Sequence, residues 1–464
     1  MSFDMPPEEF RKTAHEVVDW IADYLEGIRD YRVMPIMEPG SLVRSLPKSG
    51  PEQGEPAGRI LEDFRNLVIP AVNHWNHPRF FGYFSVSASH PGILGEMLMS
   101  ALNVNGMLWK SCPAATELEQ VTLGWLRQWL GLPEEFFGII YDTASISTMH
   151  AIAAAREMAD PEARERGGSQ NLVLYCSEQA HSSVEKGAIA IGIGQKNVRK
   201  IAADDRFRMR TDLLKAAIEE DVRASKKPFC VVATVGTTST TSVDPVSEIV
   251  PLAEEHGMWL HIDGAYGGTA ALVPEHRHIL DGAARAHSLV MNPHKWLFTP
   301  QDASVFYTRK PDILRRAFSL VAEYLRTAED ERVVNYMDYG VQLGRRFRSL
   351  KLWFVLRNFG REGIIEILRN HIAWAKELAC AIDADPRFEV AAPVPFSLVC
   401  FRFKGSDEQN RLLLDRINAD GQAFLSHTVL NGRFVLRLAI GDIKTTREDV
   451  METWKCISKL AETL

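Results

Sequence analysis

The sequence predicts an α/β protein with a mostly parallel sheet in a large domain and a smaller α+β domain at the C-terminal end. Between residues 85 and 345, short apolar runs alternate with helical patterns; after residue 346 a long helical pattern leads into short strands and two further helices. Uniformly apolar runs are typical of strands buried on both faces of a parallel sheet. We therefore expect three parts: an N-terminal helical segment (1–84), the large domain (85–345) and the small domain (346–464).

The composition is that of an ordinary globular protein and argues against several function classes. Of the 464 residues, 46% are hydrophobic and 24% charged, and the net charge is −7. An acidic chain offers no basic face to nucleic acid or to an anionic membrane, and no run approaches the roughly 18 apolar residues of a membrane helix. The N-terminus lacks the basic start and apolar run of a signal peptide. We expect a cytoplasmic protein that binds neither nucleic acid nor membrane.

The six cysteines are scattered and form neither a CxxC pair nor the spacing of a metal site. Cys176, Cys230 and Cys400 lie within apolar runs. We interpret all six as reduced core residues and expect no metal site. The other three are Cys112, Cys380 and Cys456.

Residues 8–30 form a helical stripe that follows Pro6-Pro7 and begins with Glu8 and Glu9. Apolar side chains recur at positions 10, 14, 17, 18, 21, 25 and 28, which is the spacing of one helix face. A Pro- and Gly-rich stretch follows, so this helix cannot bury its apolar face by itself. We expect it to pack on another subunit or to wrap the main body.

The large domain is predicted to alternate strands and helices. Its predicted strands are Leu172–Cys176, Phe229–Val235, Met258–Asp263, Ser288–Met291 and Ala303–Thr308. Its predicted helices include Glu117–Trp129, Ser147–Met158 and Val246–His256. Ligands of such sheets bind beyond the carboxyl ends of the strands.

The small domain is predicted from residues after 346. A long helix is expected over Phe347–Asn370, and two shorter ones over Glu408–Asp420 and Thr446–Leu460. Short strands are expected over Phe388–Ala391, Leu398–Lys404 and Phe434–Ile440. This mixture is typical of an α+β fold.

Two strand ends carry the residues that a pyridoxal phosphate site needs. Asp263 ends one apolar strand, and Lys295 lies just past another, within Asn292-Pro293-His294-Lys295-Trp296. The lysine amine can form a Schiff base with the cofactor aldehyde, and the carboxylate can keep the pyridine nitrogen protonated. A surface lysine and an ordinary strand-end aspartate are the alternatives. The apolar residues after Lys295 make a solvated position less favourable, so we predict the cofactor site.

Two polar stretches are candidates for binding the cofactor phosphate. Asp142–Thr148 precedes a helical pattern, and Gly236–Thr241 follows a predicted strand. Phosphates bind backbone N–H groups at helix N-termini, supplemented by hydroxyls. Taken alone, the first stretch is equally well explained as an N-cap and the second as a polar loop.

His181 follows the strand 172–176 directly, within Gln179-Ala180-His181-Ser182-Ser183. A histidine there can stack on the cofactor ring and take part in proton transfer. A structural histidine is the alternative, and we adopt that interpretation for the other scattered histidines.

Together these motifs resemble the aromatic-L-amino-acid decarboxylases, the group II pyridoxal-phosphate decarboxylases with the aspartate-aminotransferase-like fold (fold type I). The resemblance extends from about residue 8 to residue 460. The blocks that carry it begin at Ser111, Gln179, His261, Asn292, Leu343 and Phe434, and read SCPAATELE, QAHSSVE, HIDGAY, NPHKW, LGRRFRSL and FVLR. The family implies pyridoxal 5′-phosphate as cofactor, an amino-acid substrate and a homodimer with shared active sites.

The resemblance implies a role for each matching residue. Lys295 resembles the Schiff-base lysine, Asp263 the partner of the pyridine nitrogen and His181 the stacked histidine. The other matching cofactor positions are Ala144, Ser145, Thr238, Ala265, Asn292 and His294, together with Leu343 and Gly344, which reach across the dimer interface in the family.

Residues 320–330 are similar to the mobile catalytic loop of the family, and their later half is polar and charged. Tyr324 resembles the tyrosine that protonates carbon after carbon dioxide leaves. Tyrosine there, with His181, is the decarboxylase pattern; related aldehyde synthases, which release aldehyde, ammonia and peroxide, replace one or the other. A different reaction on the same fold, such as that of a cysteine desulfurase or lyase, is not supported, because this sequence has no suitably placed loop cysteine. A non-catalytic relative is disfavoured by the intact Lys295, Asp263 and His181.

The substrate slot departs from the family pattern. By resemblance it comprises Trp75, Tyr83, Phe84, Ser85, Val86, Asn105 and Met107. Ser85 and Val86 replace proline and threonine of animal members, Asn105 replaces a branched aliphatic residue and Met107 a phenylalanine. Asn105 is expected either to hydrogen-bond the substrate ring or to support residues that do. Gly344 matches a position where glycine leaves room for an indole, which favours tryptophan or a broad aromatic range. The expected substrates are tryptophan, 5-hydroxytryptophan, DOPA, tyrosine or phenylalanine. Glutamate and histidine are not expected, because Trp296 after the lysine is typical of the aromatic branch of the family.

Overall fold

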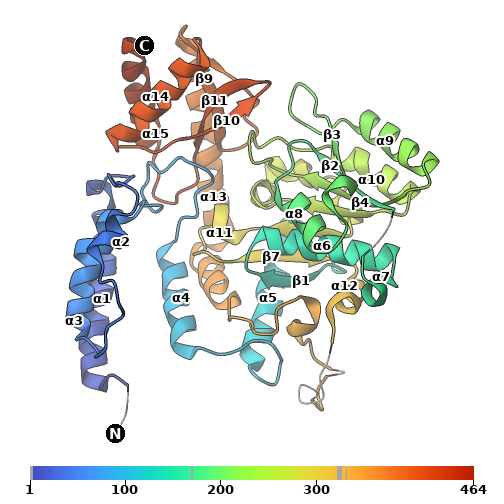
Figure 1. The fold of residues 1–464 in the computed structure, drawn as a ribbon, viewed down its shortest axis with the longest axis horizontal. Helices are drawn as coiled ribbons and strands as arrows, with labels where there is room; N and C mark the ends of the chain where they lie inside the picture. The colour runs from blue at the N-terminus through green and yellow to red at the C-terminus, as the bar shows by residue number, and fades with distance from the viewer. Residues whose placement is uncertain (1–3, 169–170, 321–326, 331) are drawn as a thin grey trace. The chain divides into compact units, whose positions relative to one another are not determined.

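The structure is a computed structural model that describes residues 4–168, 171–320, 327–330 and 332–464. The chain forms two compact units (Figure 1). One contains the N-terminal residues up to Ser85 together with Arg402–Leu464, and the other is Val86–Phe401. The division into three parts at residues 84 and 345 is not tested by these units and stays a prediction.

A seven-stranded sheet, with order β1-β7-β6-β5-β4-β2-β3, organises the unit Val86–Phe401. Strands β2 to β6 pair in parallel, and β7 pairs antiparallel with both β6 and β1. Strand β1 therefore points in the same direction as the parallel strands, which confirms the predicted mostly parallel α/β fold. The strands are β1 (Phe137–Tyr141), β2 (Leu172–Ser177), β3 (Val198–Ile201), β4 (Lys227–Thr234), β5 (Trp259–Asp263), β6 (Ser288–Met291) and β7 (Ser304–Thr308).

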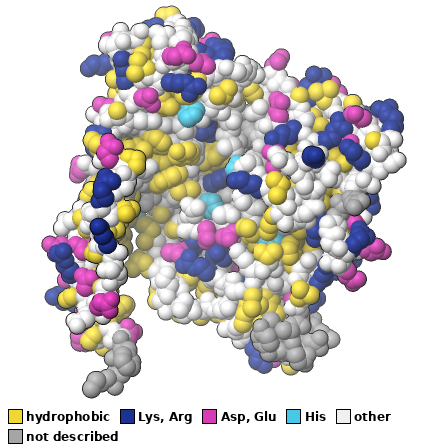
Figure 2. Space-filling model, in the orientation of Figure 1, with side chains coloured by type: hydrophobic (Ala, Val, Ile, Leu, Met, Phe, Trp, Pro, Cys, Tyr) yellow, Lys and Arg dark blue, Asp and Glu magenta, His cyan; other side chains and the backbone are white. Residues whose placement is uncertain are grey.

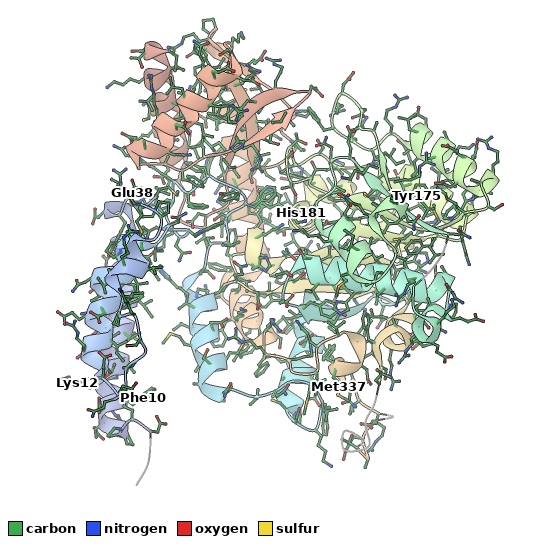
Figure 3. All side chains as sticks on the ribbon, in the orientation of Figure 1. Phe10, Lys12, Glu38, Tyr175, His181 and Met337 are labelled. Atoms are coloured by element: carbon green, nitrogen blue, oxygen red, sulfur yellow. The ribbon has the colours of Figure 1, made fainter. Side chains whose placement is uncertain are left out.

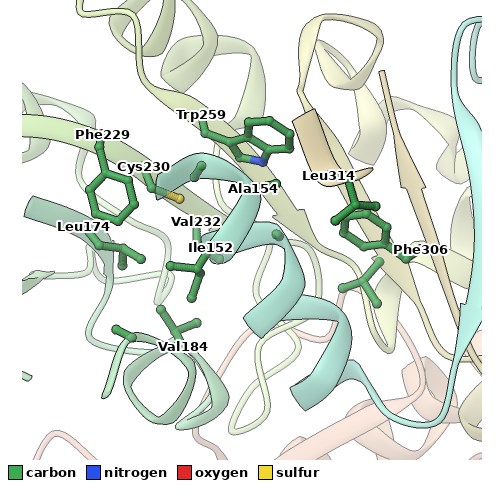
Figure 4. Packing of buried hydrophobic residues seen from close by; sticks show 14 of the residues in the cluster. Ile152, Ala154, Leu174, Val184, Phe229, Cys230, Val232, Trp259, Phe306 and Leu314 are labelled. Carbon is green, nitrogen blue, oxygen red and sulfur yellow. The ribbon is translucent and has the colours of Figure 1, made fainter. Parts of the chain in front are cut away.

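The core of this unit lies between the sheet and its helices. Every residue of β5, β6 and β7 is buried, as the uniformly apolar runs predict for strands covered on both faces. Helix α6 (Ala144–Ala159) contributes Ile152 and Ala154, which pack against strand residues such as Val232 and Trp259 (Figure 4). Close packing of this kind fixes the strand ends that carry the candidate site.

The helices of this unit connect and cover the strands. Helix α8 packs beside α6, and α9 and α10 pack on β4 (Figure 1). Besides α6, the helices are α4 (His90–Leu102), α5 (Pro113–Leu130), α7 (Ala163–Arg166), α8 (Ser183–Ala190), α9 (Thr211–Arg223), α10 (Val246–Glu255), α11 (Pro293–Trp296), α12 (Pro311–Phe318) and α13 (Ser349–Ala384).

The other unit contains the N-terminal helices and the end of the chain. Its helices are α1 (Pro7–Glu26), α2 (Ser41–Ser45), α3 (Ala57–Asp63), α14 (Asp407–Asp420) and α15 (Arg447–Leu460). Strand β10 (Ser426–Leu430) pairs antiparallel with β11 (Arg433–Ala439). A four-stranded sheet has the order β10-β11-β9-β8, with β9 at Leu398–Phe403 and β8 at Phe388–Val390. Within the described residues, no helix is both long and apolar enough to cross a membrane.

Several elements differ from the prediction for identifiable reasons. Strand β3 was missed because two of its four residues, Arg199 and Lys200, are charged, as is common at a sheet edge. Helix α13 continues to Ala384 rather than ending near residue 370, and it is interrupted at Gly360, whose φ of 63° an L-residue rarely adopts. Cys380 is exposed, so the interpretation of all six cysteines as core residues is wrong for that one.

Histidines that lose contact with solvent on folding make the folded state sensitive to acid, and the half-buried His287 provides a test. Its ring stacks on Trp259 with centroids 5.0 Å apart, and its Nδ1 accepts the Leu260 N–H at 3.1 Å. Burial, aided by Lys310 and Arg309, lowers the pKa of His287 to about 4. The unfolded chain therefore binds this proton first, so stability is lost as pH falls from 6.5 towards 4.

We predict that His287→Asn, which keeps an acceptor near the Nδ1 position, flattens this loss by up to about 3 kcal/mol. Urea unfolding midpoints at pH 7.5 and 4.5 measure the effect. Parallel losses in the wild type and the variant would show that His287 does not contribute.

Candidate active site

The carboxyl ends of six strands, β1 to β6, point towards one edge of the sheet. There Asp263 is in register with Thr234 on one side and Val290 on the other. The Asn292 N–H donates to the Ala265 oxygen at 3.1 Å, which ties the segment after β6 to the segment after β5. This pairing brings the strand ends of Asp263 and Lys295 together, as the sequence pattern predicts.

Lys295 lies on the one-turn helix α11, directly after β6, where its N–H donates to the Asn292 oxygen at 3.0 Å. Burial lowers the pKa of its ammonium group, and the nearby Asp263 carboxylate partly opposes that shift. A lowered pKa increases the fraction of neutral amine, which is the nucleophilic form. The position therefore suits covalent attachment of an aldehyde.

Asp263 is the last residue of β5 and only 4% of its surface is exposed. Its Oδ1 accepts the Ala265 N–H at 3.1 Å, which fixes the orientation of the carboxylate. A buried carboxylate is stabilised by a cation or by hydrogen-bond donors. Asp263 can therefore stabilise a protonated ring nitrogen placed at this edge.

His181 lies in the turn after β2, where Figure 3 labels it, and it is solvent-exposed. Its Nδ1 accepts the Ser183 N–H at 3.1 Å and lies 2.9 Å from the Ser183 hydroxyl, so in the neutral ring Nε2 carries the proton. Partial burial of the ring lowers the pKa of His181, and the Lys295 charge lowers it further, whereas the Asp263 carboxylate raises it. These interactions join His181, Asp263 and Lys295 in one cluster. Ser183 lies in the same motif as His181 but had no predicted role.

Helix α6 begins at Ala144 rather than at the predicted Ser147, so Ala144 and Ser145 are its first two residues. Thr143 at the N-cap makes no capping hydrogen bond through its side chain to any described residue. Asp142 accepts the Thr143 N–H at 2.5 Å through Oδ1 and the Gln342 amide at 2.9 Å through Oδ2. The start of a 16-residue helix thus presents backbone N–H groups that suit a phosphate.

The loop after β4 is held by hydroxyls and by close backbone contacts. The Ser242 N–H donates to Thr237 Oγ1 at 3.0 Å, and Thr238 is exposed on this loop. Gly267 packs so closely against the backbone after β4 that an added Cβ would be 2.5 Å from the Val235 oxygen. Only glycine fits there, which lets the two loops approach each other beside Ala265.

The two polar residues before Lys295 are buried. The Nδ1 atom of His294 accepts the Ala303 N–H at 3.0 Å, and burial followed by the charge of Lys295 lowers the pKa of His294 to about 4. His294 is therefore neutral near pH 7 and can donate from Nε2. The Oδ1 atom of Asn292 is buried and has no hydrogen-bond partner within the part of the chain that the structure describes.

Leu343 and Gly344 are exposed, and Gly344 lies beside Asn105. The Asn105 Oδ1 accepts the Arg345 N–H at 2.9 Å, and its Nδ2 is 3.5 Å from the Met107 sulfur. This geometry favours the supporting role among the two predicted for Asn105. The hydrogen bond between Asn105 and Arg345 could not be predicted from the sequence, because the two residues are 240 positions apart.

Of the remaining predicted substrate residues, Trp75, Tyr83, Phe84 and Ser85 lie in the unit that contains the N-terminal helices. The rings of Trp75 and Tyr83 stack with centroids 5.7 Å apart, and Phe84 and Ser85 are buried. Val86 is the first residue of the unit Val86–Phe401. Tyr324 lies outside the described residues.

A lysine, a buried aspartate and a histidine at the carboxyl edge of a parallel sheet define a site for pyridoxal phosphate. The pyridoxal-dependent decarboxylase conserved domain matches residues 39–404, and the chain belongs to this family of carboxy-lyases. It is 40% identical to aromatic-L-amino-acid decarboxylase of Bos taurus over 477 residues, covering 99% of this chain and 97% of the relative. It is also 40% identical to phenylacetaldehyde synthase of Arabidopsis thaliana over 479 residues, with the same coverage.

Among solved structures, Catharanthus roseus tryptophan decarboxylase in complex with L-tryptophan is similar over the full length of both chains. The TM-score is 0.94 and the sequence identity 38%, with 100% of each chain covered. Together with the family match, this confirms the predicted fold type and the pyridoxal phosphate cofactor.

The residues of the edge fit that cofactor. An amine with a lowered pKa, a buried carboxylate and an open helix N-terminus match the aldehyde, ring nitrogen and phosphate that pyridoxal phosphate carries.

Proposed function

We propose that this enzyme decarboxylates an aromatic L-amino acid to the corresponding amine and carbon dioxide. The cluster of Lys295, Asp263 and His181 at the sheet edge is the observation that carries the proposal. Tyr324 in the sequence favours the amine-forming reaction. The aromatic-amino-acid decarboxylases among its relatives support the substrate class.

Each residue of the cluster has a separate task. Lys295 holds the cofactor through its amine, and Ala144, Ser145, His294 and Thr238 bind or flank its phosphate. Asp263 keeps the ring nitrogen protonated. When bound, pyridoxal phosphate supplies an electron sink for the pair of electrons released as the Cα–carboxylate bond breaks.

Proton transfer to the substrate decides the product. Tyr324 is proposed to donate its phenol proton to the substrate Cα after carbon dioxide leaves, and Nε2–H of His181 to support that transfer. The loop 320–330 would exclude water and oxygen during this step. Prompt protonation at Cα gives the amine, whereas delay exposes the carbon to oxygen.

The second candidate is an aromatic aldehyde synthase on the same scaffold, because a phenylacetaldehyde synthase is as similar to this chain as a decarboxylase is. We predict that Tyr324→Phe, which removes only the phenol hydroxyl, lowers amine formation by about 10²-fold or more and shifts the product to aldehyde and peroxide. Amine and aldehyde are quantified by chromatography. An unchanged ratio of amine to aldehyde would show that Tyr324 does not take part in the proton transfer.

The preferred aromatic side chain is proposed to depend on Gly344. A Cβ there would lie 3.8 Å from Asn105 Nδ2, an ordinary contact, so Gly344→Ser should fold normally. We predict that the added hydroxymethyl group lowers kcat/KM for tryptophan relative to tyrosine by about tenfold, because it fills space needed by an indole. If the ratio of kcat/KM for tryptophan to kcat/KM for tyrosine were unchanged, the substrate side chain would not lie beside Gly344.

We further propose that the enzyme is a homodimer with shared active sites. Helix α1 exposes Phe10 and Val18, and α4 exposes Leu94, Met97, Leu98 and Leu102. Figure 2 shows hydrophobic side chains among the charged ones on the N-terminal helices. Apolar helix faces of this extent favour an interface between subunits. Sedimentation measurements report the subunit number directly.

A further inference from the structure

A cavity of about 450 Å³ lies within the unit Val86–Phe401. It is lined by residues 242–247 and 393–396, by Lys376 on α13, and by Arg206, Arg208, His276, His278, Ile279 and Asp281. The volume is in the range of small-molecule sites. None of the residues proposed above to hold cofactor or substrate lines this cavity, so it is separate from the reaction site.

One part of the lining is apolar. Phe396, Val246 and Ile279 are buried in the protein and contribute to the cavity wall, with Pro245, Pro393 and Pro395 beside them. The Phe396 ring is held edge-on to Trp296 and to His276, with centroids 6.3 and 6.2 Å apart. A preformed apolar wall of this kind suits an aromatic ring or a short hydrocarbon chain.

The other part of the lining is cationic. Arg208 pairs with Asp204 at 2.7 Å, whereas Arg206 and Lys376 form no ion pair with a residue that the structure describes. His276 and Lys376 both line the cavity. Burial lowers the pKa of His276, and the nearby Lys376 ammonium lowers it further. Two cations without a carboxylate partner make this wall attractive to an anion.

The acidic residues of the lining do not cancel these charges. Asp244 accepts the Met209 N–H at 2.7 Å through Oδ1 and the Thr234 N–H at 2.8 Å through Oδ2. Both of its oxygens are therefore occupied by backbone donors, and burial raises the pKa of Asp244 to about 6. Asp281 is exposed to water, as are Arg206 and Lys376, so the lining holds one exposed carboxylate beside the cations Arg206, Arg208 and Lys376.

We propose that this cavity binds a small organic anion with an apolar body, of the class of aromatic carboxylates. The carboxylate would bind Arg206 and Lys376, and the ring would lie against Phe396, Val246 and Ile279. An inorganic anion leaves the apolar wall unused, and a neutral aromatic alcohol leaves the cations unpaired, so both bind more weakly.

The test uses the full-length holoenzyme and phenylacetate as the probe, with binding measured by calorimetry. The double variant Arg206→Ala/Lys376→Ala removes the two cations, and Lys215→Ala/Arg223→Ala on α9 removes the same charge elsewhere. We expect one binding event per chain in the wild type and the α9 variant, weakened about tenfold or more in Arg206→Ala/Lys376→Ala. Equal affinity in all three proteins, or equal loss in both variants, would overturn the proposal.

A ligand series tests the amphipathic character separately. The neutral 2-phenylethanol and inorganic phosphate are each expected to bind about tenfold more weakly than phenylacetate at this site. If phosphate bound as tightly as phenylacetate, the apolar wall would not contribute to binding, and this result would contradict the proposal. An unchanged cofactor absorption band and thermal midpoint in Arg206→Ala/Lys376→Ala show that the variant remains folded.

Discussion

Lys295→Ala is expected to eliminate turnover and the visible absorption of the lysine-bound cofactor. The side chain lies in the buried turn after β6, where burial lowers its pKa and favours the neutral amine. Alanine offers no nucleophile, so covalent attachment is lost and activity should fall by about 10⁴-fold or more. The absorption spectrum of the purified protein with added cofactor, and amine formation with an aromatic substrate, measure the two effects.

Lys196→Ala is the matched control, because it removes an exposed lysine of the same unit. It should keep both the absorption band and the activity. If Lys295→Ala retained wild-type turnover, the assignment of the cofactor lysine would be wrong whatever the spectrum showed.

Asp263→Asn is expected to have the next largest effect. The substitution keeps the size of the side chain and an acceptor for the Ala265 N–H, which lies 3.1 Å from Oδ1, but it removes the buried charge. An opposite charge at close range shifts a pKa by about 1–3 units, so the protonated fraction of the cofactor ring, and with it kcat, should fall about 10- to 1000-fold.

The effect of Asp263→Asn should also appear without turnover. Because the Asp263 carboxylate raises the pKa of Lys295, its removal lowers that pKa further, and cofactor absorption should change its dependence on pH. Asp205→Asn, at an exposed position, is the control. Identical kcat and pH titration in Asp263→Asn and the wild type would contradict the proposed pairing.

Much of the fold could be predicted because buried parallel strands leave a strong local signal. The uniformly apolar runs that end at Asp263 and Met291 identified β5 and β6, and the polar residues after them identified the edge of the sheet. The chemistry of Lys295, Asp263 and His181 depends on residue types placed at strand ends, which the sequence displays directly.

Contacts between distant segments could not be predicted in the same way. Asn105 anchors Arg345, and Gln342 donates to Asp142, but neither pair has a local pattern that reveals it. The orientation of His181 by Ser183 was within reach, because the two residues are adjacent in one motif, yet it requires the turn geometry. Strand β3 was missed because its edge position tolerates charge.

The most direct test of the central claim is an end-product assay of the purified holoenzyme. Tryptophan, 5-hydroxytryptophan, DOPA, tyrosine, phenylalanine, histidine and glutamate are supplied separately, and amine, aldehyde and peroxide are quantified. The proposed function predicts amine from at least one aromatic substrate, without stoichiometric peroxide. Aldehyde with stoichiometric peroxide, or amine from glutamate or histidine alone, would contradict it.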